Sequence, residues 1–208
     1  MNVIFFAAHP DDLDFYCSGT IRKHLFNKDN VFIVYMTSGD LGWLNYGWGR
    51  KRLGLKRELE ALNAAKILGV PKKNVFFFRF PDGKMKYCKK CVKRTLDILN
   101  KLKPKIIYSP ENRYFYSYYF HDDHIATGMC VEEAVKHLSY RPILYVFHTI
   151  IPNYFNDISN FYTRKSLSAH ETQQIMLKPG NLLHLFLAKF YGCFIHARYA
   201  EAFRKVDY

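Results

Sequence analysis

NVIFFAAHPDD, residues 2–12, begins with an apolar run and ends in a cluster of polar groups. The run from Val3 to Ala8 is continuously hydrophobic, which is typical of a strand that is buried on both faces. No basic residues precede it, as they would in a secretory signal peptide, and His9 and Pro10 end it. The segment therefore predicts a buried strand followed by a polar turn, and we expect a cytoplasmic protein.

Short apolar runs alternate with longer amphipathic segments along the rest of the chain. We expect strands near residues 2–8, 31–37, 74–79, 105–109 and 143–148, and helices near 17–27, 51–68, 84–102 and 124–138. Fully apolar strands joined by helical crossovers form a parallel sheet with helices on both faces. The pattern predicts a single α/β domain over residues 1–208, with a Rossmann-like, mostly parallel sheet. A further apolar stretch at 182–195 is too short to span a membrane, and we expect a core helix or a surface-docking helix there.

Charge and cysteine content limit the classes of function. The chain of 208 residues has a formal net charge of +13 and five cysteines. An odd number of cysteines without a secretory signal favours reduced thiols, and a single pair such as Cys88 and Cys91 is a weak zinc motif. Nucleic acid, an anionic membrane surface and an acidic substrate all match the positive charge. The lysines between 72 and 105 are spaced like those of a solvated helix face, and no nucleic-acid-binding motif is present, so we expect no nucleic acid partner.

Two clusters of imidazoles and carboxylates follow two of the predicted strands. His9, Asp11 and Asp12 come after the first strand, and residues 121–124, His-Asp-Asp-His, come after the fourth. Taken alone, the first cluster is also consistent with a helix cap and a turn histidine. In a parallel sheet, however, ligands bind beyond the carboxyl ends of the strands, where both clusters would meet. Zinc binds imidazole nitrogen and carboxylate oxygen, and a catalytic zinc keeps three protein ligands, so the two clusters together predict a metal site.

With these motifs the sequence resembles the LmbE or PIG-L type of zinc-dependent N-deacetylases, the GlcNAc de-N-acetylase-like enzymes. Residues 8–12, Ala-His-Pro-Asp-Asp, are similar to the AHPDD signature of that family, and residues 121–124 are similar to its HxDH motif. Residues 37–42 resemble its TxGxxG loop, and residues 81–83, Pro-Asp-Gly, resemble its PDG-like turn. Residues 199–204, Tyr-Ala-Glu-Ala-Phe-Arg, look like its C-terminal motif. These similarities follow one another in order along nearly the whole chain.

The resemblance implies one Zn²⁺ per chain and a role for individual side chains. Its zinc ligands would be His9, Asp12 and His124. The catalytic groups would be Asp11 as the general base, His121 as the group that stabilises the oxyanion or protonates the leaving amine, and Asp123 as the residue that orients His121. The expected substrate contacts are Arg57 and Asp82, together with His148 after the fifth strand. Those three are also consistent with a surface ion, a turn residue and a structural histidine.

The activity implied by the resemblance is hydrolysis of an N-acetyl group on an amino sugar of the GlcNAc type, with release of acetate. The positive charge favours an anionic substrate, and a lipid-linked sugar also fits. Aromatic side chains at 114–120 and at Trp43, Tyr46 and Trp48 are expected either to line a sugar pocket or to pack over the core. The competing functions are a metal-binding domain without activity and a basic nucleic-acid-binding module. Homo-oligomerisation is left open by the sequence.

Overall fold

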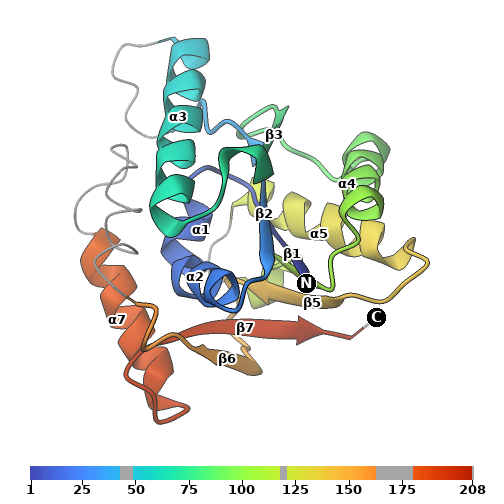
Figure 1. Cartoon of the computed structure of the whole chain (residues 1–208). Coiled ribbons are helices and arrows are strands. Elements are labelled where there is room, and N and C mark those ends of the chain that lie inside the picture. Colours follow the sequence, from blue (N-terminus) through green and yellow to red (C-terminus); the bar gives the residue numbers. More distant parts are fainter. Residues whose placement is uncertain (43–48, 118–120, 163–179, 208) are drawn as a thin grey trace.

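The computed structural model describes residues 1–42, 49–117, 121–162 and 180–207 (Figure 1). In these ranges, one sheet contains seven strands in the order β3-β2-β1-β4-β5-β7-β6. The strands are β1 (Asn2–Ala7), β2 (Asn30–Thr37), β3 (Val75–Phe80), β4 (Ile106–Pro110), β5 (Ile143–Phe147), β6 (Tyr154–Asp157) and β7 (Ala200–Val206). The helices are α1 (Asp12–Tyr16), α2 (Ser18–Phe26), α3 (Arg50–Leu68), α4 (Lys89–Leu102), α5 (Asp122–Lys136) and α7 (Gly180–Cys193), with short 3₁₀ turns η1 (Lys72–Asn74) and η2 (Tyr114–Tyr116).

The predicted mostly parallel sheet is confirmed. β1 to β5 pair in parallel, with β1 in the centre between β2 and β4, where Val3 lies opposite Val31 on one side and Ile106 on the other. Only β7 runs against its neighbours, pairing antiparallel with both β5 and β6 in the described sheet. The chain winds outward from β1 to β3 and then returns to start β4 on the opposite side of β1. Such a reversal leaves a crevice at the carboxyl ends of the two strands, where ligands bind in open α/β sheets.

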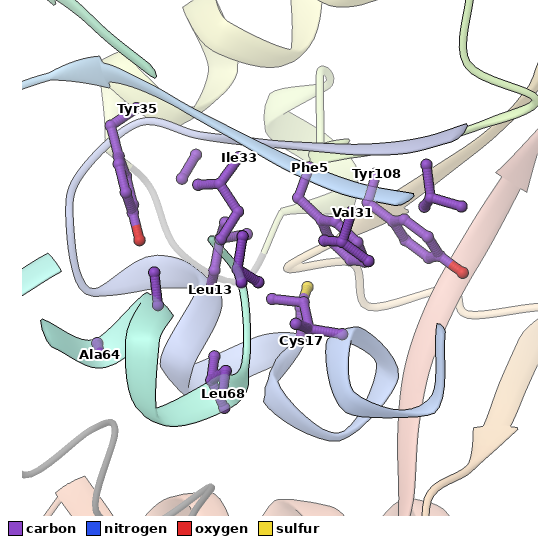
Figure 2. Packing of buried hydrophobic residues seen from close by; sticks show 14 of the residues in the cluster. Phe5, Leu13, Cys17, Val31, Ile33, Tyr35, Ala64, Leu68 and Tyr108 are labelled. Carbon is purple, nitrogen blue, oxygen red and sulfur yellow. The ribbon is translucent and has the colours of Figure 1, made fainter. Parts of the chain in front are cut away.

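Helices cover both faces of the sheet because β1 is apolar on both faces. Val3, Phe5 and Ala7 join a buried cluster with residues of α1, α2 and α3, part of which Figure 2 shows. Ile4 and Phe6 point to the other face, into a second cluster with residues of α4 and α5. Successive side chains of a strand face opposite ways, so one hydrophobic run supplies two cores. The continuity of the run therefore accounts for the three-layer arrangement.

The C-terminal part of the sheet differs from the sequence expectation. Residues 199–204 were expected as a motif but not as a strand, and most of them lie in β7, which joins β6 to the edge of the sheet. The helix expected at 17–27 is α2, and the short helix α1, which was not expected, precedes it and ends before Cys17. The helix expected at 84–102 begins only at Lys89, because the preceding residues form a loop beside the polar edge of the sheet. That loop contains Gly83, which has a φ of +68°, a conformation that favours glycine.

The cysteines also differ from expectation. Cys91 on α4 and Cys130 on α5 are both buried and are paired as a disulfide, with their Cα atoms 6.0 Å apart. We had expected reduced thiols, and for this pair that expectation was wrong. Cys88 is exposed and free, so the two cysteines of the CxxC motif do not form a pair of their own.

The apolar stretch near the C-terminus forms α7. Its inner side buries His184 and Ala188 against the rest of the domain, whereas Leu183, Phe186 and Phe190 are about half exposed or more. The sequence left open a core helix or a surface-docking helix, and α7 combines features of both: one side is buried and the other is apolar and exposed. None of the described helices is long and apolar enough to cross a membrane.

Two carboxylates attach β7 to the rest of the domain. Glu201 accepts hydrogen bonds from the backbone N–H groups of Gly19 and Thr20 at the start of α2, both at 2.8 Å. Glu111, directly after β4, forms a fully buried ion pair with Arg204, whose Nε lies 2.9 Å from Oε2. Residues of the C-terminal motif therefore stabilise the start of α2 and the end of β4.

Replacing Arg204 tests how much this attachment contributes. Arg204→Met leaves the Glu111 carboxylate buried without its cation, which typically costs about 3–5 kcal/mol of unfolding free energy. Lys205→Met, the same kind of change at the exposed neighbouring position, is expected to stay within about 0.5 kcal/mol of wild type. Chemical denaturation measures both. Equal midpoints for Arg204→Met and wild type would show that the pair does not stabilise the fold.

Candidate active site

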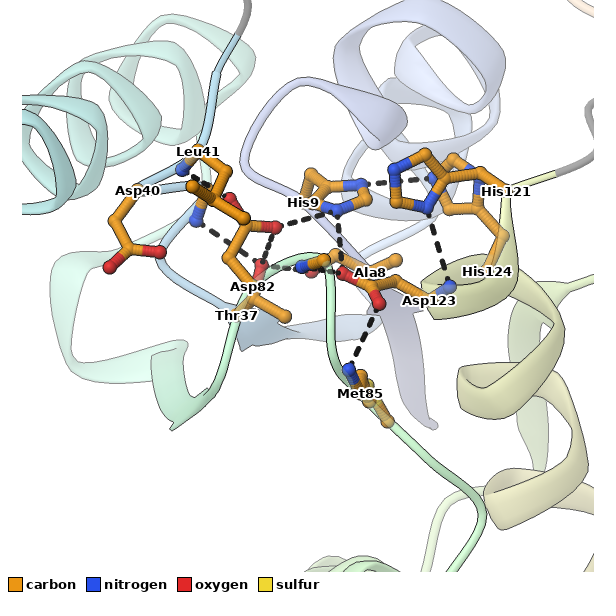
Figure 3. Close-up of polar contacts among 12 residues, drawn as sticks. Ala8, His9, Thr37, Asp40, Leu41, Asp82, Met85, His121, Asp123 and His124 are labelled. Atoms are coloured by element: carbon orange, nitrogen blue, oxygen red, sulfur yellow. Dashed lines mark hydrogen bonds and ion pairs between the residues drawn. The ribbon is translucent and has the colours of Figure 1, made fainter. Parts of the chain in front are cut away.

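The polar residues that follow the strands meet at one edge of the sheet (Figure 3). His9 follows β1, Asp82 follows β3, and His121 and His124 lie at the start of α5, which comes after β4. The helix α5 packs closely against the end of β4. A Cβ atom on Gly128, in the middle of α5, would lie only 2.6 Å from the carbonyl oxygen of Pro110. The topology therefore brings together side chains that are far apart in the sequence, as we expected for the carboxyl edge.

Three candidate metal-binding side chains converge. The Nδ1 atom of His9 lies 3.2 Å from Nε2 of His124, which lies 3.0 Å from Oδ1 of Asp12. The other oxygen of Asp12 accepts a hydrogen bond from the backbone N–H of His9 at 3.0 Å. His9, His121 and His124 can also each present one nitrogen within 4.8 Å of the others. Ligand atoms around a tetrahedral zinc are about 3.4 Å apart, so the donor types and these two separations fit this metal. His9, Asp82 and Asp123 form a second group whose donor atoms lie within 4.8 Å of one another.

The other ring nitrogen of His9 faces two carboxylates. Its Nε2 atom lies 3.0 Å from Oδ1 of Asp82 and 3.2 Å from Oδ2 of Asp123. Burial lowers the pKa of His9, but the hydrogen bonds to Asp123 and Asp82 outweigh burial and raise that pKa to about 10. For the Asp12 carboxyl the signs are opposite: burial raises the pKa, but the neighbouring His124 and His9 rings lower it more and hold it well below its usual range. The site therefore attracts positive charge.

Asp82 and Asp123 both lie close to His9. Asp82, which we expect to contact substrate, is buried, and its Oδ2 accepts a hydrogen bond from the backbone N–H of Leu41 at 2.6 Å. The carboxylate of Asp123, which we expect to orient His121, contacts His9 and accepts from the N–H groups of Gly83 and Met85 at 2.7 and 3.0 Å. Sequence spacing did not reveal these contacts, because they depend on how the loop after β3 folds back on α5.

Arg57 lies behind Asp11. Its Nη2 atom is 3.0 Å from Oδ1 of Asp11, and its Nη1 donates to the carbonyl oxygen of Gly39 at 2.9 Å. Arg57, which we expect to contact substrate, is buried and lies where it can orient the Asp11 carboxylate. Gly39 has a φ of +63°, and a Cβ atom there would lie 2.2 Å from Nη1, so the loop needs glycine at this position.

The two remaining histidines differ in their surroundings. His121 is partly exposed, its Nδ1 accepts a hydrogen bond from the backbone N–H of Asp123 at 3.3 Å, and burial lowers its pKa. In the neutral ring the Nε2 atom then carries the proton. His148 is buried behind the site, where its ring centroid lies 4.7 Å from that of His124 and 3.9 Å from that of Tyr16. Burial lowers the pKa of His148 well below its usual value, so this ring is neutral.

Thr37, the first residue of the loop that resembles TxGxxG, is a residue of the site that motif spacing did not reveal. Its hydroxyl donates to the carbonyl oxygen of Ala8 at 2.9 Å and lies 3.5 Å from Oδ1 of Asp82. Thr37 thereby connects the ends of β1 and β2 to the loop after β3. The resemblance of residues 37–42 was the signal that pointed to it.

Only part of the aromatic stretch is described by the structure. Phe115 is 90% exposed and Tyr114 is 48% exposed, so these two rings do not pack into the core. Tyr116 lies under the guanidinium of Arg204, with 5.6 Å between Cζ and the ring centroid. The expectations for Tyr118, Tyr119 and Phe120, and for Trp43, Tyr46 and Trp48, fall on residues outside the described ranges.

Comparison with known proteins places this site in a family. The profile of PIG-L, described as GlcNAc-PI de-N-acetylase, matches residues 4–135, which is more than half of the chain and contains His9, Asp12 and His124. The chain belongs to the PIG-L family. The resemblance that the sequence motifs suggested is thereby confirmed.

Relatives of this PIG-L protein are deacetylases. The diacetylchitobiose deacetylase of Thermococcus kodakarensis is 28% identical, over 98% of this chain and 82% of the relative. A probable N-acetyl-alpha-D-glucosaminyl L-malate deacetylase 2 of Bacillus anthracis is 26% identical, over 83% of this chain and 81% of the relative. The structure of N,N'-diacetylchitobiose deacetylase from Pyrococcus horikoshii superposes with a TM-score of 0.90 at 25% identity, covering 99% and 83% of the two chains.

Gly128→Ala tests the close approach of α5 to β4 that positions His121 and His124. Alanine favours helices by about 1 kcal/mol over glycine, but here its Cβ would meet a backbone oxygen at 2.6 Å. We expect a net loss of about 1–3 kcal/mol, as in other overpacked sites. Gly49→Ala is the matched control, because a Cβ atom there meets nothing within 4 Å. Unchanged or increased stability of Gly128→Ala in urea denaturation would contradict the prediction.

Proposed function

We propose that the chain is a zinc-dependent N-deacetylase, which hydrolyses the N-acetyl group of an amino sugar of the GlcNAc type and releases acetate. One observation carries the proposal. In a chain of a de-N-acetylase family, Nε2 of His124 lies 3.2 Å from Nδ1 of His9 and 3.0 Å from Oδ1 of Asp12, and Asp12 directly follows Asp11 in the chain. This combination supplies both a metal-binding set and a base that is separate from it.

The charge balance supports a divalent cation. Four carboxylates lie at this edge of the sheet, and two cations of the described residues contact them: Arg57 on Asp11, and the His9 ring, whose pKa is raised, on Asp82 and Asp123. The four are Asp11, Asp12, Asp82 and Asp123. Buried charges of one sign need compensation, and the donors at His9, Asp12 and His124 are of the kinds that zinc accepts. Zinc in this position would act as a Lewis acid, which lowers the pKa of water and polarises an amide carbonyl.

The side chains around these donors have the properties that amide hydrolysis requires. Asp11 would accept a proton from the attacking water, and Arg57 would keep its carboxylate directed at the site. His121 would donate an Nε2–H hydrogen bond to the developing oxyanion, and the proton that Asp11 takes from water would pass to the leaving nitrogen. The C–N bond of the acetamide breaks, the water oxygen joins the acetyl carbon, and acetate and a free amine are formed.

The names of the relatives point to small amino sugars as substrates. The relative from Thermococcus kodakarensis and the structure from Pyrococcus horikoshii are both named for diacetylchitobiose. We therefore place N-acetylglucosamine units of a short chito-oligosaccharide first among the candidates. The net charge of +13 keeps an anionic conjugate as a second choice, which the same assay can include.

Asn replacements at two neighbouring carboxylates test the proposal. Asp12→Asn exchanges an anionic metal ligand for a neutral one, so zinc content and turnover should fall together. Asp11→Asn leaves the three proposed ligands in place and removes the base, which is typically worth about a hundredfold to ten-thousandfold in rate. Zinc is measured by elemental analysis, and turnover by acetate release from N,N'-diacetylchitobiose and N-acetylglucosamine.

The wild-type protein serves as the reference, with close to one zinc per chain expected and activity lost on chelation. The roles are reversed if Asp11→Asn loses zinc while Asp12→Asn keeps it. Full turnover by Asp11→Asn would exclude the proposed base. A wild-type protein that binds zinc but releases no acetate from any N-acetylated sugar would favour an inactive metal-binding domain.

A further inference from the structure

His9 is held by two carboxylates that the proposed reaction does not use. Asp82 and Asp123 approach the same nitrogen, Nε2, at 3.0 and 3.2 Å, and the accessible fractions of their side chains are 5% and 0% (Figure 3). The two residues belong to different parts of the fold, the loop after β3 and the first turn of α5. We call this arrangement the carboxylate clamp, meaning Asp82 and Asp123 on Nε2 of His9.

Backbone groups fix both carboxylates in place. Asp123 accepts hydrogen bonds from the N–H groups of Gly83 and Met85 at 2.7 and 3.0 Å, and Asp82 accepts from the N–H of Leu41 at 2.6 Å. Because Gly83 directly follows Asp82, Asp123 holds the loop that carries the other half of the clamp. Neither carboxylate can turn toward a bound sugar without losing a backbone hydrogen bond, and for Asp123 this would leave the buried N–H of Met85 unsatisfied.

The clamp determines which nitrogen of His9 can bind a metal. In the neutral imidazole that binds a metal, the nitrogen that faces carboxylates keeps the proton and the other nitrogen presents its lone pair, so a bound metal would displace the second proton of the imidazolium. Here that other nitrogen is Nδ1, which lies 3.2 Å from Nε2 of His124. Ligating histidines commonly donate their second N–H to a carboxylate, which fixes the tautomer and makes the ligating nitrogen more basic.

We propose that Asp82 and Asp123 are positioning residues, which together hold His9 in its Nε2–H tautomer so that Nδ1 binds the metal. The inference rests on the proposed function. It assigns Asp82 to the metal site rather than to sugar binding, and Asp123 to His9 rather than to His121. Because each carboxylate contacts the same N–H group and Asp123 also anchors the loop of Asp82, the effects of the two replacements will not be additive.

Asp82→Asn is the sharpest variant. Its amide oxygen must face the N–H of Leu41 to keep that hydrogen bond, which turns the NH₂ group toward Nε2 of His9. A donor in that position favours the tautomer protonated on Nδ1, which has no lone pair for the metal there. Asp123→Asn weakens the clamp from the other side. Asp122→Asn is the matched control, because this exposed neighbour of Asp123 contacts Tyr114 rather than His9.

Two measurements on the full chain test the clamp. Zinc affinity, from competition with a chromophoric chelator, should fall about 10–100-fold in Asp82→Asn and in Asp123→Asn, and should not change in Asp122→Asn. Nitrogen-15 NMR of the histidine rings in the zinc-loaded wild type should show His9 with a slowly exchanging Nε2 proton and a metal-bound Nδ1. In both clamp variants that proton should exchange faster with solvent, an effect that a general loss of stability does not produce at His9 alone.

The possible outcomes distinguish a failure of the clamp from a failure of the proposed deacetylase function. Wild-type zinc affinity in both variants, with an unchanged Nε2 proton, overturns the clamp while the deacetylase proposal stands. An increase in KM for the sugar at unchanged zinc affinity in Asp82→Asn also overturns it, in favour of sugar binding. A wild-type protein that binds no zinc removes the proposed function and the clamp with it. If Asp82→Asn fails to fold, Asp82→Ala, which places no donor against His9, provides the same comparison.

Discussion

Four buried or half-buried carboxylates lie at one edge of the sheet, and each needs hydrogen-bond donors or a cation that the surrounding structure must supply. Each one receives N–H donors or a cation from a different part of the chain: Arg57 for Asp11, the backbone of His9 for Asp12, Leu41 for Asp82, and Gly83 and Met85 for Asp123. Charged groups leave water only when such partners are present. The loops after β2 and β3 reach these positions through Gly39 and Gly83, both at positive φ.

The central part of the fold was predictable because its strands are fully apolar. Val3 to Ala8 faces two cores at once, and a run of that kind has few alternatives to a central parallel strand. The strands β6 and β7 were missed because neither contains a long apolar run. They are strands because β7 pairs with β5 and with β6, and a sequence does not show such pairing. The disulfide between Cys91 and Cys130 was missed for a similar reason, since their separation of 39 residues is bridged only when α4 packs on α5.

The sequence predicted which residues meet at the site better than it predicted their contacts. His9, Asp12 and His124 come together because strand ends meet, and the order of strands and motifs was sufficient to infer that. The hydrogen bonds of Asp82 and Asp123 depend on side-chain direction within two loops, which spacing does not determine. The fold itself does not decide the chemistry either, since a 4-carboxy-2-hydroxymuconate hydratase from Pseudomonas putida superposes with a TM-score of 0.81 at 18% identity.

The proposed zinc lies between the ends of β1 and β4, and its position can be measured directly. Crystals of the zinc-loaded protein, with diffraction recorded at the zinc absorption edge, would give an anomalous difference map of the metal alone. We expect one peak per chain, bounded by Nδ1 of His9, Oδ1 of Asp12 and Nε2 of His124. A peak beside Nε2 of His9 between Asp82 and Asp123, a peak at Cys88, or no peak at this edge of the sheet would contradict it.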